Sequence, residues 1–140
     1  MRARLGINTC FALKRWPAPR EWASVVRNDL GLDIVELSLD LLEGMDDQLV
    51  RPRVIESARS ALAAEDLVLE ATFTGLGAYS QNLLMHPHAD RREAAHRWFE
   101  NVIELSADLD ALGTGGHVGS MSVPDWAEPA VRAERWTGLK

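Results

Sequence analysis

Two ionisable side chains lie where this sequence could do chemistry. His117 follows a pair of glycines, so the backbone around it is open and its imidazole could reach a substrate oxygen or transfer a proton. Its alternative role is a loop histidine that bonds only to water. Glu36 lies in the middle of an otherwise apolar run. A buried, unpaired carboxylate there would cost several kcal/mol, so we expect it to contact substrate or a structural partner.

Two asparagines complete the set of candidate binding residues. Asn8 lies in the first apolar run, and its amide can donate to and accept from a sugar hydroxyl. Stabilising a turn is an equally good role for Asn8. Asn82 lies in a long polar loop and is expected to line the pocket. We therefore assign His117 as the catalytic candidate and Asn8, Glu36 and Asn82 as substrate-binding candidates, with no metal ligand among them.

Composition and charge narrow the class of protein. The chain has 140 residues, of which 46% are hydrophobic and 26% charged, as in an ordinary globular domain. The formal net charge of −6 argues against nucleic acid as a partner, because phosphate backbones would be repelled. No apolar stretch is long enough for a membrane span. Cys10 is the only cysteine, and this fits a reducing, cytoplasmic setting.

Strand-like and helix-like segments alternate along the whole chain. Strands are expected at residues 5–13, 33–39 and 67–73, with a fourth strand and its loop at 111–123. Apolar residues at helical spacing predict helices over 19–30, from Pro52 to about 65, over 90–110 and over 125–136. Alternation of this kind predicts an α/β fold with a parallel sheet, whose functional groups lie at the C-terminal ends of the strands.

The pattern favours a partial TIM barrel, with about four of the eight βα units. No glycine-rich phosphate loop follows the first strand, as an open nucleotide-binding sheet would have. A complete barrel needs about 250 residues. We therefore expect residues 1–140 to form a single domain that is the N-terminal half of a barrel, either as a fragment of a longer protein or as a half that pairs with a second copy. Its open strand edges would favour self-association.

Several segments, in order, resemble one known family. They are the LGLDIVEL segment at 30–37, NLL at 82–84, DRRE at 90–93, IELSADLDA at 103–111 and GGHVG at 115–119. The chain is similar to the sugar phosphate isomerase/epimerase proteins of the xylose isomerase-like TIM barrel superfamily. The resemblance places a histidine at the end of the fourth strand, where His117 stands.

The resemblance implies an isomerase that interconverts aldose and ketose, or epimers, by proton transfer, in carbohydrate metabolism. Its substrate would be a sugar or sugar phosphate. A divalent metal, Mn or Mg, would be held in the full-length parent by strands five to eight, so this chain alone would hold none and would be inactive. One alternative is a non-catalytic binding module formed by associating half-barrels. A metal-dependent AP endonuclease-like protein is another, less favoured because the chain is acidic and has Thr72 to Thr74 where that class would have a histidine.

Overall fold

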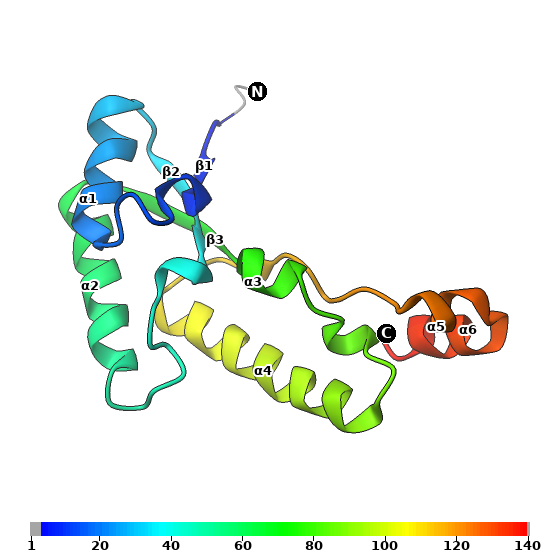
Figure 1. The fold of residues 1–140 in the computed structure, drawn as a ribbon. Helices are drawn as coiled ribbons and strands as arrows, with labels where there is room; N and C mark the ends of the chain where they lie inside the picture. Colours follow the sequence, from blue (N-terminus) through cyan, green and yellow to red (C-terminus); the bar gives the residue numbers. More distant parts are fainter. Residues whose placement is uncertain (1–3, 140) are drawn as a thin grey trace.

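The computed structural model describes residues 4–139 and shows an open, curved arrangement of alternating strands and helices (Figure 1). Its strands are β1 (Ile7–Asn8), β2 (Ile34–Ser38), β3 (Val68–Phe73) and β4 (Thr114–Gly115). They form one parallel sheet in the order β1-β2-β3-β4. The predicted α/β fold class, a partial TIM barrel of parallel βα units, is therefore confirmed.

Three longer helical segments connect the strands. They are α1 (Pro19–Ser24), which continues as the π-helical turn η2 (Val25–Asp29), α2 (Arg51–Ala64) and α4 (Ala89–Asp108). The shorter segments are η1 (Thr9–Ala12), η3 (Leu39–Leu41), α3 (Gly75–Tyr79), η4 (Leu83–Met85), α5 (Val123–Ala127) and α6 (Pro129–Thr137). In the described part of the chain, no helix has the length and apolar character needed to cross a membrane.

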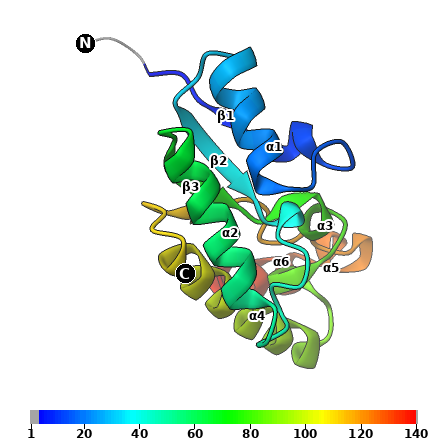
Figure 2. The same cartoon turned by 90° about the vertical axis from the view of Figure 1, so that its left-hand side faces the viewer.

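The hydrophobic core lies between the sheet and the helices on one of its faces. Figure 2 shows α1 and α2 on the near side of the strands, with α4 below them. Val35 and Leu37 of β2 point to that side, and Trp22 from α1 is fully buried with them. The other buried apolar residues of this core include Val26, Leu69, Ala58, Ala61, Leu62, Val102, Leu105 and Leu109. Removing these side chains from water supplies the main driving force for folding.

The second face of the sheet is the one that would face the inside of a barrel. Successive side chains of a strand point to opposite faces, so Glu36 points away from the helices while Val35 and Leu37 point toward them. Asn8 is directly opposite Glu36 in the register of β1 and β2. A β-bulge leaves Glu70 without a pairing partner on β2 and brings Ala71 opposite Glu36. The carboxyl ends of the strands thereby present their polar residues at one rim.

The first predicted strand is too long. Residues 5–13 were expected to be one strand, but only Ile7–Asn8 pairs with β2 and the chain then turns into η1. The reason lies in two side chains. The Asn8 Oδ1 accepts a hydrogen bond from the Cys10 N–H at 2.8 Å, which caps the turn. The Thr9 hydroxyl accepts the Ser38 N–H at 2.8 Å and anchors the turn to the end of β2.

The fourth predicted helix is also wrong in its continuity. Residues 125–136 were expected to form one helix, but the structure has α5 and α6, separated at Glu128. Pro129 begins α6 and disfavours helical backbone in the residue before it, and Glu128 accordingly has an extended ψ of 109°. The two helices lie side by side beyond the sheet (Figure 1).

Candidate functional site

The ends of β1 and β2 bring two of the predicted site residues together. The Asn8 amide Nδ2 donates a hydrogen bond to the Glu36 carboxylate Oε2. Because the Asn8 Oδ1 is used by the Cys10 N–H, the whole amide has a fixed orientation. Both side chains are partly buried. Asn8 therefore has the turn-stabilising role considered from the sequence and, in addition, orients a carboxylate at the rim of the sheet.

His117 lies just beyond β4 and is held by the end of β3. Its backbone N–H donates to the Thr74 hydroxyl at 2.9 Å. Its ring makes edge-type contacts with two aromatic rings, with centroid distances of 5.7 Å to Phe73 and 4.6 Å to Tyr79. The imidazole is thus partly buried beside an aromatic pair. No hydrogen bond among the described residues joins it to the Asn8–Glu36 pair.

Asn82 lies beside the chain segment that follows His117, and no hydrogen bond among the described residues joins it to Asn8, Glu36 or His117. Its Nδ2 donates to the Ser120 carbonyl at 2.6 Å, and the neighbouring backbone makes a bond from Leu84 N–H to the Val118 carbonyl at 3.1 Å. Asn82 also lines a cavity of about 780 Å³ between α3 and α4. That cavity is lined by none of Asn8, Glu36 and His117. We place the candidate site at the strand ends, where Asn8, Glu36 and His117 lie, and not in this cavity. The rim formed by the strand ends is open on one side and therefore does not enclose a pocket of its own.

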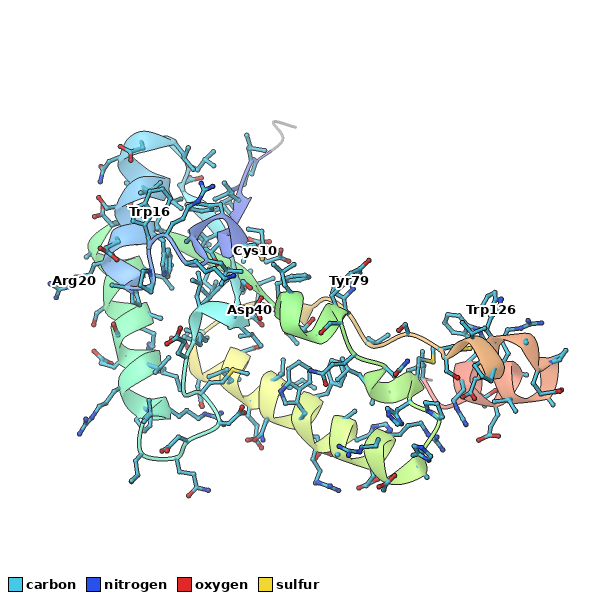
Figure 3. All side chains as sticks on the ribbon, viewed as in Figure 1. Cys10, Trp16, Arg20, Asp40, Tyr79 and Trp126 are labelled. Carbon is cyan, nitrogen blue, oxygen red and sulfur yellow. The ribbon has the colours of Figure 1, made fainter. Side chains whose placement is uncertain are left out.

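Asp40 is a residue that the sequence reading missed. It follows β2 by two residues, and its carboxylate accepts the backbone N–H groups of Leu76 and Gly77 and the Ser38 hydroxyl. Figure 3 shows Asp40 beside the start of α3. Reading residues 40–48 only as a loop concealed this role. An acidic residue directly after a strand end is the signal that could have revealed it.

The end of β3 is structural. The Thr72 hydroxyl is fully buried and makes hydrogen bonds of 2.6 Å with the Ser106 hydroxyl and 2.7 Å with the Thr114 hydroxyl. Those bonds join β3 to α4 and β4. In the AP endonuclease-like alternative, the end of this strand would carry a histidine.

The described residues do not fit a metal ion by themselves. Between residues 4 and 139, no group of three or more His, Cys, Asp or Glu side chains is placed to hold one. His86 and His88 have ring centroids 5.4 Å apart, but the His86 Nδ1 already accepts the His88 N–H at 3.0 Å. The expectation of Mn or Mg in a full-length parent remains a prediction about other strands.

Four parallel strands with helices on one face and polar groups at one rim define part of a (β/α) barrel. No protein-family model matches the chain, and no curated protein matches it. Among solved structures, it is similar to a "Putative Xylose isomerase" from Rhodospirillum rubrum ATCC 11170, with 32% sequence identity and a TM-score of 0.91 over 98% of this chain. The chain covers 46% of that protein, so it spans less than half of its length.

A second solved structure has the same fold at lower similarity. It is a protein from Sinorhizobium meliloti 1021, with 20% sequence identity and a TM-score of 0.57. The match covers 96% of this chain and 43% of that protein. The chain therefore has the xylose isomerase-like fold, as its sequence motifs predicted.

Proposed function

We propose that the chain supplies the first four βα units of a sugar isomerase or epimerase. In this proposal His117 transfers a proton at the sugar carbon skeleton, and Asn8, Glu36 and Asn82 bind hydroxyls of a sugar or sugar phosphate. The likeness to the Rhodospirillum rubrum protein is the observation that carries the proposal, because it extends over nearly the whole chain at 32% identity. The acidic net charge and single cysteine support a cytoplasmic metabolic enzyme rather than a protein that binds nucleic acid.

The geometry at the strand ends supports this assignment. The Asn8 amide orients the Glu36 carboxylate, which can accept hydrogen bonds from sugar hydroxyls. The Thr74 hydroxyl fixes the backbone at His117, and histidine is the side chain most often used for proton transfer near neutral pH. Preorganised groups of this kind accelerate a reaction by removing the need to orient them during it.

Completion of the barrel belongs to the same proposal. Four strands leave β1 and β4 with no further neighbour in the described sheet, while a closed barrel of this type has eight. We propose that the remaining units complete the active site, including any Mn or Mg site, and that this chain alone is inactive. Pairing with a second copy is the alternative source of the missing strands.

The test compares the chain with a completed barrel. The purified 140-residue chain, supplied with Mn or Mg and a panel of monosaccharides, should show no interconversion. A fusion of this chain to the segment of the Rhodospirillum rubrum protein that it does not cover should interconvert at least one sugar. His117→Phe should abolish that turnover while keeping the aromatic contacts, and His96→Phe, at an exposed site on α4, should not. Turnover by the purified monomer, or a fully active His117→Phe fusion, would contradict the proposal.

A further inference from the structure

Tyr79 is an exposed aromatic residue that the proposed reaction does not use. It is the only tyrosine of the chain, and 68% of it is exposed to solvent. Its ring centroid lies 4.6 Å from that of His117, at an interplanar angle of 62°. In Figure 3 its side chain points away from α4. We propose that Tyr79 forms an aromatic subsite beside His117 that binds the apolar C–H face of an uncharged sugar or polyol; this rests on the proposed function.

The helix α3, which carries Tyr79, is held in place by a side chain from another part of the chain. α3 has only five residues, too few to be stable through its own hydrogen bonds. The Asp40 carboxylate accepts the N–H groups of Leu76 and Gly77 and the Ser38 hydroxyl, so α3 is attached to the end of β2. Gly75 permits this approach, because a Cβ there would lie 2.4 Å from the Asp40 Oδ1 and its φ is +91°. Asp40 is therefore a positioning residue for Tyr79.

His117 is attached to the segment that leads from β3 into α3. Its N–H bonds to the hydroxyl of Thr74, the residue that immediately precedes α3. A Cβ at Gly116 would lie 2.1 Å from that hydroxyl oxygen, so the close approach depends on glycine. The two rings are thus held in contact by separate backbone attachments. An arrangement fixed from both sides is the kind that gives a binding residue low conformational cost.

The chemistry of this rim favours a sugar. One face of a monosaccharide presents C–H groups, and its edge presents hydroxyls. An exposed tyrosine ring can cover an apolar face while its own hydroxyl stays in water. The neighbouring imidazole of His117 can then hydrogen-bond with a hydroxyl at the edge of the same molecule. A flat, partly apolar and uncharged ligand matches this combination.

Proton NMR titration of the 140-residue chain with D-xylose tests the subsite, since a single tyrosine gives assignable ring signals. The Tyr79 and His117 ring signals should shift together and saturate at tens of millimolar sugar. Tyr79→Phe should keep the dissociation constant within about twofold, and Tyr79→Ala should weaken it about fivefold or more. Leu76→Ala, an exposed residue on the same helix, is the matched control and should leave it unchanged.

Two results would overturn the subsite. One is the absence of a saturable shift in the unmodified chain, and the other is an unchanged dissociation constant in Tyr79→Ala. The fusion described above separates this inference from the reaction. Turnover that requires His117 but keeps its KM in Tyr79→Ala would overturn the subsite alone. Tyr79-dependent binding of D-xylose by a fusion without turnover would overturn the proposed reaction alone.

Discussion

The polar residues at the strand ends are oriented by a few short-range bonds. Their types and their places after apolar runs could be read from the sequence, but their partners could not. The pairing of Asn8 with Glu36 depends on the register of β1 against β2, which no local pattern specifies. Asp40 was missed for the same reason, because its partners Leu76 and Gly77 are more than thirty residues away. Long-range partners at a site come from topology rather than from local spacing.

The hydrogen bond between Asn8 and Glu36 should re-form when the donor and the acceptor are exchanged between the two positions. Asn8→Asp keeps the acceptor for the Cys10 N–H but places a second carboxylate against Glu36, so we expect it to lower the free energy of unfolding by about 1 to 2 kcal/mol at neutral pH. Adding Glu36→Gln to Asn8→Asp restores a donor and an acceptor and should recover most of that loss. Urea unfolding of the single and double variants measures it. An additive loss in the double variant would show that the two side chains do not interact.

The two glycines before His117 should differ sharply in tolerance. Gly116 has a φ of +124°, and an added Cβ would meet the Thr74 hydroxyl and backbone N. Gly115 has no atom within 4 Å of an added Cβ. We expect Gly116→Ala to destabilise the chain by about 1 to 3 kcal/mol and to remove the contact between the rings of Tyr79 and His117.

Gly115→Ala is the matched control and should be close to neutral. Denaturant unfolding gives the stability difference, and nuclear Overhauser effects between the Tyr79 and His117 rings report the contact. Equal stability of the two variants, with the ring contact intact in both, would contradict the positioning of His117 by Thr74.

The secondary-structure elements followed hydrophobic periodicity where they pack against the core. The predicted segments at 33–39, 67–73 and 90–110 correspond closely to β2, β3 and α4, whose apolar stripes are long and regular. Hydrophobic periodicity predicted the wrong element bounds near the two ends of the described chain. The first strand ends early because side-chain hydrogen bonds compete with strand pairing, and the last helix divides at Pro129. The last helical segment has no buried residue, and the first segment packs on the core through the turn that follows β1, with Ala12 fully buried there.

The packing of α5 against α6 should depend in part on a largely buried ion pair. The Arg135 Nε lies 3.3 Å from the Asp125 Oδ2, with only 10% and 14% of the side chains exposed. Neither helix contains a buried residue, and a second link between them is Arg132, whose guanidinium donates to the Trp126 carbonyl at 2.9 Å and lies over the Trp126 ring. We expect Asp125→Ala to speed amide hydrogen exchange in residues 129–137 about tenfold, because it removes the link from Arg135 to α5 and leaves its guanidinium only the Glu134 carboxylate and the Pro87 carbonyl.

A second ion pair provides the control for this prediction. Arg97 and Glu93 lie on the same helix, α4, and both side chains are largely exposed. Glu93→Ala should therefore change exchange rates in α4 very little, as expected for an exposed pair. Hydrogen exchange followed by mass spectrometry resolves both regions. Unchanged exchange over 129–137 in Asp125→Ala would show that the ion pair does not hold the two helices together.

Within residues 4–139, helices cover one face of the sheet and leave the other uncovered. Sequence length relative to a complete barrel was sufficient to predict this, because an eight-stranded barrel cannot close with four strands. The similarity to a protein of which the chain covers 46% agrees with that reasoning. The uncovered face carries apolar side chains that a complete barrel would bury. Val68 is 42% exposed, whereas its neighbour Leu69, on the covered face, is 7% exposed.

These two neighbouring residues test whether the uncovered face drives association. We expect Val68→Lys to keep the fold, with a change in unfolding free energy of less than about 1 kcal/mol, and to reduce self-association by placing charge on an exposed apolar face. Leu69→Lys places the same charge in the core and should prevent stable folding, since a buried unpaired ammonium is strongly unfavourable. Size-exclusion chromatography with light scattering gives the mass of each variant, and circular dichroism gives its stability. If Val68→Lys unfolded the chain as fully as Leu69→Lys, this face would be packed in solution, and the half-barrel would have to be closed by a second copy of itself.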